Sequence, residues 1–163
     1  MKKFELTNEF IANRFGTKLF RIRALVEFGD VEAGELGGYV EKESNLGHDD
    51  NAWVYGNARV YGNAQVSGNA RVYGDAQVSG DARVCGDARV CGNGDYAYAH
   101  GFGSVNRTTT FFRLKDGGVG VRCGCFYGTL AQFRDNVCET HGETKKAQEY
   151  LMLADLMDFR FKN

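Results

Sequence analysis

Valine recurs at every sixth position between residues 51 and 92, and glycine and polar residues separate the valines. This stretch is made of seven consecutive hexapeptides: NAWVYG, NARVYG, NAQVSG, NARVYG, DAQVSG, DARVCG and DARVCG. The Gly-Asn or Gly-Asp dipeptide between units tolerates the positive φ of a tight turn. The pattern therefore predicts a short strand with one buried face, then a turn, every six residues. The valines in register are Val54, Val60, Val66, Val72, Val78, Val84 and Val90.

This period excludes two other architectures. An amphipathic helix needs apolar residues at a spacing of 3.6, and here each recurring glycine would cost about 1 kcal/mol. A hairpin meander is disfavoured because such short strands pair weakly unless they stack in a solenoid. The repeats thus favour a solenoid.

The repeats resemble the hexapeptide-repeat superfamily, whose members form left-handed parallel β-helices with three hexapeptides in each triangular coil. The chain also resembles bacterial and prophage proteins labelled as transferases, on the segments FRIRALVEFGD before the repeats and CGCFYGT after them. The resemblance implies a mainly β protein with about four left-handed coils. Leu36, Val40 and Leu46 continue the register backwards, so the β-helix is expected to begin near Gly34.

The flanking segments are expected to seal the two ends of the β-helix, because terminal coils expose apolar edges. Apolar and polar residues alternate from Phe20 to Phe28, and Phe4 to Ile11 is expected to pair with this strand. After the repeats, TTTFFRL and VGVRCGCF bracket a KDGG turn, which predicts a hairpin. A helix capped by Thr129 and a second helix from about Thr144 to Phe159 follow. The predicted divisions are residues 1–33 (N-terminal β cap), 34–105 (β-helix) and 106–163 (C-terminal α+β cap).

With three hexapeptides in a coil, residues 18 apart stack at about 4.8 Å. One face of the coil then carries aromatic and guanidinium side chains together, which suits protein interfaces and cation–π contacts. Outward aromatics also raise β propensity and pack across coils, so both interpretations remain open. The candidate binding residues on this face and its neighbour are Trp53, Tyr55, Tyr61, Arg71, Tyr73 and Arg89.

Composition and charge limit the cellular compartments and the classes of partner that we expect. The formal net charge is -1, so direct nucleic-acid binding is not favoured, and the chain has 22 glycines and no proline. The N-terminus lacks an apolar export segment, no stretch is long enough for a membrane span, and the five cysteines are an odd number. These features predict a cytoplasmic protein without a membrane partner.

The three histidines offer one candidate catalytic base and exclude one type of zinc site. Hexapeptide acyltransferases use a histidine as the base that deprotonates the acceptor, and His100, just after the last clean repeat, is the candidate for that role. His48 lies in a degenerate unit, where a hydrogen-bonded structural histidine is expected. The three-histidine zinc site of the carbonic anhydrases in this superfamily is rejected, because the histidines of this chain are scattered.

A structural zinc site is the alternative for the C-terminal cysteines. Residues two apart on a strand share a face, as do residues three apart on a helix. The candidate ligands are therefore Cys123, Cys125, Cys138 and His141. Buried free cysteines that pack the C-terminal cap are the competing interpretation.

The function expected from these features is a non-catalytic binding or assembly module with no cofactor unless the zinc site forms. The expected partners are a second copy of the chain and a host protein. Because the resemblance includes prophage proteins, the expected action is to occupy a surface of a host macromolecule, such as a defence or nucleic-acid enzyme. The alternative is an acyltransferase with His100 as general base.

Overall fold

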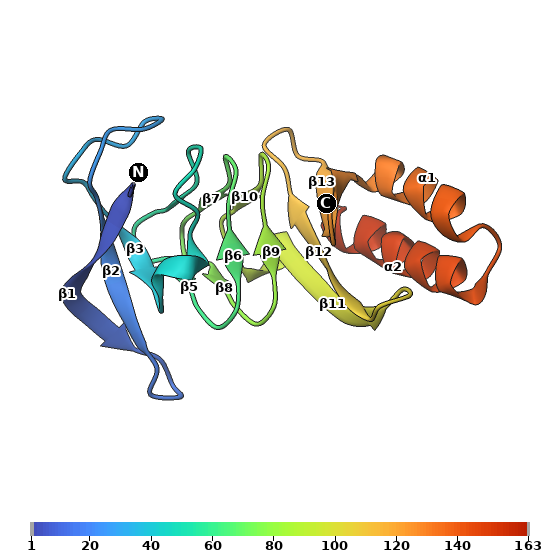
Figure 1. Ribbon diagram of the computed structural model, residues 1–163, viewed down its shortest axis with the longest axis horizontal. Helices are drawn as coiled ribbons and strands as arrows, with labels where there is room; N and C mark the ends of the chain where they lie inside the picture. Colours follow the sequence, from blue (N-terminus) through green and yellow to red (C-terminus); the bar gives the residue numbers. More distant parts are fainter. Residues whose placement is uncertain (1, 163) are drawn as a thin grey trace.

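The computed structural model describes residues 2–162 and is elongated, with short stacked strands between a β hairpin at one end and two helices at the other (Figure 1). The fold is mainly β with two helices. Within residues 2–162, no helix is both long enough and apolar enough to span a membrane.

Each hexapeptide contributes one two-residue strand, and strands 18 residues apart pair in parallel. Trp53 pairs with Arg71 and Arg71 with Arg89, Arg59 pairs with Gln77, and Gln65 pairs with Arg83. The predicted register is therefore confirmed on three faces. The strands are β4 (Trp53–Val54), β5 (Arg59–Val60), β6 (Gln65–Val66), β7 (Arg71–Val72), β8 (Gln77–Val78), β9 (Arg83–Val84) and β10 (Arg89–Val90).

The interior of this solenoid is built from valine and alanine, all fully buried from Ala52 to Val90. The turn glycines from Gly56 to Gly86 have φ between 59° and 68°, as the Gly-Asn and Gly-Asp pairs predict. Gly92 does not turn in this way: its φ is -149°, because the chain leaves the repeat there and enters the 3₁₀ turn η2 (Asn93–Asp95). Six glycines therefore make equivalent turns, each with a backbone φ in the positive region.

At the N-terminal end, a three-stranded antiparallel element joins the solenoid through one of its faces. The strands β1 (Phe4–Ala12) and β2 (Lys18–Ala24) form the predicted hairpin, and β2 pairs with β3 (Leu36–Val40). Strand β3 then pairs in parallel with β5, so one sheet runs in the order β1-β2-β3-β5-β8. The short 3₁₀ turn η1 (Glu43–Asn45) follows β3.

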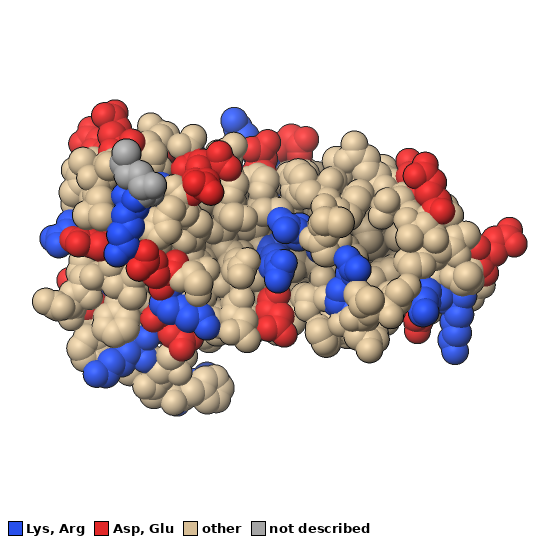
Figure 2. Space-filling view, in the orientation of Figure 1, with Lys and Arg blue, Asp and Glu red and all other residues tan. Residues whose placement is uncertain are grey.

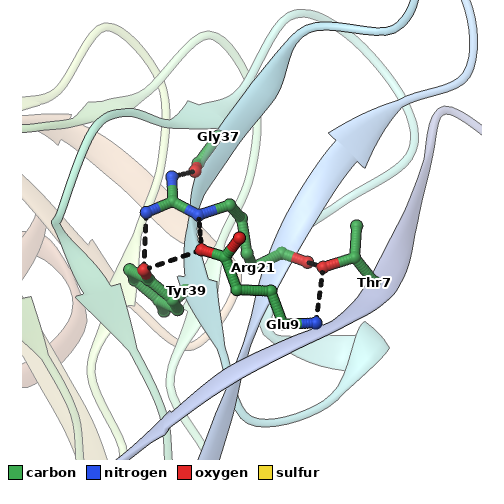
Figure 3. A network of polar contacts seen from close by, with 5 residues as sticks. All are labelled: Thr7, Glu9, Arg21, Gly37 and Tyr39. Carbon is green, nitrogen blue, oxygen red and sulfur yellow. Dashed lines mark hydrogen bonds and ion pairs between the residues drawn. The ribbon is translucent and has the colours of Figure 1, made fainter.

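Arg21 links these three strands through its side chain (Figure 3). Its guanidinium donates to Glu9 Oε2 at 2.6 Å and to the Gly37 carbonyl at 2.8 Å, and it also bonds the Tyr39 hydroxyl. Thr7 Oγ1 donates to the Arg21 carbonyl at 2.8 Å. The hydrogen bond from Arg21 lowers the pKa of Glu9 below its usual value. The hairpin is thus tied to β3 as well as paired with it.

At the C-terminal end, a four-stranded antiparallel sheet lies between the last coil and the helices (Figure 1). Its strands are β11 (Tyr96–Phe102), β12 (Arg107–Arg113), β13 (Val119–Cys123) and β14 (Phe126–Thr129), and the predicted hairpin is β12–β13. Phe112 belongs to the solenoid core, whereas its neighbour Phe111 packs against the helices. Alternate residues of β12 therefore seal two different cores.

The two predicted helices are present, and the first has the predicted N-cap. Helix α1 (Leu130–His141) begins after Thr129, whose hydroxyl accepts from the Gln132 backbone N–H in a capping box. Helix α2 (Lys145–Phe161) begins after Thr144 and ends two residues later than the sequence indicates. Its buried face includes Tyr150, Ala154 and Met157.

Candidate functional site

The parallel strands β4, β7 and β10 place four of the predicted binding residues around one shallow pocket of about 340 Å³. This pocket is lined by Tyr55, Arg71, Tyr73 and Arg89, which we call the Tyr/Arg surface. The 18-residue stacking brings these residues together, because positions 71 and 89 repeat on adjacent levels of the same face.

Local contacts fix the orientation of the side chains at the Tyr/Arg surface. Arg71 Nη1 lies 3.3 Å from Asp30 Oδ2, and the Tyr55 hydroxyl donates to the other oxygen of Asp30 at 3.1 Å. The Arg71 guanidinium carbon lies 5.9 Å from the centroid of the Tyr55 ring. Burial raises the pKa of Tyr55 above its ordinary value. Arg89 donates to the backbone carbonyls of Asn69 and Ala88.

Trp53 does not belong to this surface, so the expectation that it is displayed was wrong. Its side chain is fully buried, although its backbone pairs in the expected register. Phe28 and Phe4 cover it, with ring centroids at 5.2 Å and 6.3 Å. The N-terminal segment thus covers this outward position, and Trp53 belongs to one core together with Phe4 and the valines of the solenoid. The indole Nε1 has no hydrogen-bond partner among residues 2–162.

Tyr61 lies on a different face of the solenoid, that of β5 and β8. Its hydroxyl donates to Gln77 Oε1 at 3.3 Å. The structure does not bring Tyr61 to the other predicted binding residues, because successive hexapeptides occupy successive faces of a coil.

A second concave feature, which we call the polar groove, follows the face of β6 and β9 as far as the C-terminal sheet. It has a volume of about 550 Å³. His100 lies in it, exposed on β11, and its Nδ1 is 2.8 Å from Thr108 Oγ1. Other residues that line it include Lys42, Asp81, Arg83, Arg107 and Thr108.

His48 has the structural role expected for it. Its Nδ1 accepts a hydrogen bond from the Lys3 backbone N–H at 3.0 Å, and its Nε2 lies 2.9 Å from Glu43 Oε1. The imidazole also stacks on the Phe4 ring at a centroid distance of 4.4 Å. His48 therefore links the N-terminal strand to η1.

The four candidate zinc ligands only partly come together. Cys123, Cys125 and His141 line one pocket of about 400 Å³, but Cys138 is exposed outside it. In the part of the chain that the structure describes, no three His, Cys, Asp or Glu side chains lie close enough to hold a metal ion. The zinc site stays a prediction to which this geometry adds no support.

Cys123 is engaged in other contacts in this pocket. Thr109 Oγ1 donates to its Sγ at 3.2 Å, and its Sγ lies 3.7 Å from the Tyr150 hydroxyl. Burial, together with the neighbouring Cys123, raises the pKa of Tyr150 to about 12. The pocket is therefore a hydrogen-bonded junction between β12, β13 and α2.

Comparison with protein families gives matches inside the repeat region. The model described as "YdcK Beta solenoid repeat" matches residues 52–66, 64–80 and 76–92. These consecutive matches and the parallel pairing support a β-solenoid repeat protein. A search among curated proteins gives no significant match.

Sequence reasoning missed the polar groove as a feature. Arg83 occupies the same hexapeptide position as Gln65, Gln77 and Arg89, so nothing in the repeat marks it. Arg107 lies outside the repeats and carries no period at all. The only available signal was the position of His100 directly after the last repeat.

Proposed function

We propose that this protein is a non-catalytic binding and assembly module that presents the Tyr/Arg surface to a protein partner. The observation that carries the proposal is the convergence of Tyr55, Arg71, Tyr73 and Arg89 around one pocket on a rigid face. Tyrosine and arginine are enriched at the energetically dominant positions of interfaces. Side chains already held by Asp30 and by backbone carbonyls lose little conformational entropy on binding.

The proposed partners are a second copy of the chain and a host protein whose surface would be occupied. Two guanidinium groups among aromatic rings suit a protein surface that offers carboxylates and apolar area. Inhibition of a host defence or nucleic-acid enzyme, as part of a phage or prophage programme, is the specific form that we propose. Its support is the resemblance of the flanking segments to prophage proteins.

The fold that we propose for this module is a left-handed parallel β-helix of about four coils, with an N-terminal β cap and a C-terminal α+β cap. Parallel pairs 18 residues apart support three hexapeptides in each coil. The domain limits at 33/34 and 105/106 remain predictions. A crystal structure with right-handed coils would overturn this assignment.

The repeat itself supplies substitutions that test the Tyr/Arg surface without disturbing the solenoid. Arg71→Gln with Tyr73→Ser converts NARVYG into NAQVSG, a unit that the chain already contains at residues 63–68. We expect this double variant, with Arg89→Gln added, to lose self-association by sedimentation and to recover less partner from the native cell. The matched control is Arg59→Gln with Tyr61→Ser, the same conversion on another face.

Two results decide the proposal. Equal association by the surface variant and the control variant, both with wild-type thermal unfolding, would remove the Tyr/Arg surface from the function. Loss of association in the surface variant alone supports it.

A second candidate function, acyl transfer with His100 as general base, has one observation in its favour. His100 is exposed in the polar groove, and its hydrogen bond to Thr108 uses only Nδ1. Among residues 2–162, its Nε2 has no hydrogen-bond partner, so this nitrogen is free to act as a base. Calorimetric titration with a coenzyme A thioester tests this candidate. Heat that His100→Ala abolishes supports it, and absence of heat leaves the binding module as the function.

A further inference from the structure

The polar groove combines three cationic side chains with a single acid. Lys42, Arg83 and Arg107 line it together with Asp81. In residues 2–162, none of these three cations forms an ion pair, whereas Arg71, Arg113 and Arg134 each pair with an aspartate. Figure 2 shows basic side chains gathered near the middle of this face, over β9 and the neighbouring strands of the C-terminal sheet. The groove thus holds an excess of unpaired positive charge.

The cations are arranged along the axis of the solenoid. Lys42 Nζ donates to Asn63 Oδ1 at 3.2 Å, and Asn63 Nδ2 donates to Asp81 Oδ1 at 3.4 Å, so one hydrogen-bonded ladder crosses three levels. Arg83 lies two residues beyond Asp81, on β9, and pairs with Gln65 of the level before. These levels are about 4.8 Å apart.

Arg107 lies against the turn that joins β13 to β14. Gly124 has a φ of 60°, and a Cβ added there would overlap the Arg107 guanidinium. The Gly124 carbonyl in turn accepts a hydrogen bond from Arg122 Nε at 2.7 Å. Gly124 therefore suits the positive φ of the turn, and the Arg107 guanidinium lies directly beside it.

We infer that the polar groove binds a small molecule that carries two or more phosphate groups, with Arg83 and Arg107 on the phosphate oxygens. Guanidinium groups match phosphate oxygens in bidentate geometry, and Lys42 adds a point charge. Ser44 and Thr108 supply hydroxyl donors for the remaining oxygens. The three cations exceed the one acid by two charges, so the groove suits a multiply charged anion. Arg83 on β9 and Arg107 on β12 offer two separate positions for phosphate groups.

Size and composition separate this ligand from a nucleic-acid strand. A volume of about 550 Å³ lies in the range of small-molecule sites, roughly 300–1,000 Å³. Among residues 2–162, no Phe, Tyr or Trp lines the groove, so these residues offer unpaired bases no stacking platform. The recognised chemistry is the diphosphate, whether free or attached to a nucleoside.

The experiment is calorimetric titration of the full-length protein with pyrophosphate, with ADP and with citrate in separate runs at physiological salt. Arg83→Gln introduces glutamine, which already stands at the equivalent positions 65 and 77, so the solenoid should fold unchanged. We expect it to weaken pyrophosphate binding about tenfold, and Arg83→Gln with Arg107→Gln to abolish it. Arg59→Gln, at the same hexapeptide position on another face, is the matched control and should leave the affinity unchanged.

Each result counts for or against the site. Tighter binding of ADP than of pyrophosphate would extend the ligand to a nucleoside diphosphate, and equal binding would restrict recognition to the diphosphate itself. Absence of pyrophosphate and ADP binding to the wild type, or citrate binding as tight as that of pyrophosphate, overturns the inference. So does an equal effect of Arg83→Gln and Arg59→Gln. A far-ultraviolet circular dichroism melt of each variant shows that a lost affinity is not a lost fold.

Discussion

The inward positions of the solenoid hold only small aliphatic side chains, whereas both ends of it are closed by aromatic rings. From Ala52 to Val90 the buried inward residues are alanine and valine, and each level repeats the one below. At one end Phe4 and Phe28 surround Trp53, and at the other Phe112 stacks on Tyr127 at 6.3 Å. A repeating level needs the same small residue on every coil, but a terminal level must be covered by side chains large enough to replace the missing neighbour.

The largest effect on stability is expected when a residue at one end of the solenoid is compared with a residue in its middle. Phe112 and Val72 are both fully buried in the same core. We expect Phe112→Ala to lower the free energy of unfolding by about 4 kcal/mol and Val72→Ala by about 2 kcal/mol, since a ring leaves the larger cavity. Urea unfolding measures both. A cost for Val72→Ala equal to that of Phe112→Ala would show that the ends are no more sensitive than the middle.

The next test compares two corners of the solenoid. Gly56 and Gly68 have similar positive φ values, 59° and 65°. A Cβ at Gly56 meets nothing within 4 Å, whereas one at Gly68 lies 2.8 Å from the backbone nitrogen of Gly86 on the next level. We expect Gly56→Ala to cost about 1 kcal/mol for its backbone conformation alone, and Gly68→Ala to cost about 3 kcal/mol because the levels must also separate. Similar melting temperatures for the two variants would mean that contact with the next level does not restrict which residue can stand at position 68.

The structural features of both regions also differ in how far the sequence predicts them. The register, the glycine turns with positive φ and the β12–β13 hairpin follow from local patterns, because the hexapeptide period and the turn residues specify them directly. The Thr129 cap follows in the same way. The burial of Trp53 does not, since no period tells which segment covers the first coil.

The candidate sites divide along the same line. All four members of the Tyr/Arg surface were among the predicted binding residues, because they lie two residues apart in one hexapeptide or 18 residues apart on adjacent levels. The polar groove was not, since it joins Lys42 of the N-terminal region to Arg107 of the C-terminal sheet. Only the packing of three regions brings these side chains together.

The N-terminal end should also contribute a dependence of stability on pH, through one buried lysine. Burial lowers the pKa of Lys3 from 10.5 to about 8, although Asp50 and Asp49 oppose the shift. Lys3 Nζ donates to the Ala52 carbonyl at 2.7 Å and lies over the Phe28 ring. Between about pH 8 and pH 10.5 the unfolded chain keeps a proton that the folded chain has lost, so stability contributed by this group rises with pH in that window.

Lys3→Met should remove this rise, and Lys2→Met, at an exposed lysine paired with Glu43, should keep it. Urea unfolding at pH 7.5 and pH 10 measures the difference for each protein. Because other groups titrate in the same range, the quantity to compare is the pH effect in the wild type minus that in each variant. Identical pH effects in the wild type and Lys3→Met would place the lysine in solvent.

The smallest expected effects concern the two helix caps, which test whether the C-terminal end unfolds independently of the solenoid. Thr129 has a reciprocal cap, since Gln132 Oε1 accepts from the Thr129 backbone N–H at 2.9 Å, whereas Thr144 only accepts from Ala147. We expect Thr129→Ala to cost about 1 kcal/mol and Thr144→Ala to cost less.

Hydrogen exchange followed by mass spectrometry locates these costs. Because α1 packs against the Phe111 side of the sheet and not against the solenoid core, Thr129→Ala should raise exchange in α1 and leave the Val60 to Val84 amides protected. Exchange that rises equally in both regions would show that the aromatic end and the aliphatic repeats open as one unit. In that case the two regions would unfold cooperatively although one is packed with aromatic rings and the other with small aliphatic side chains.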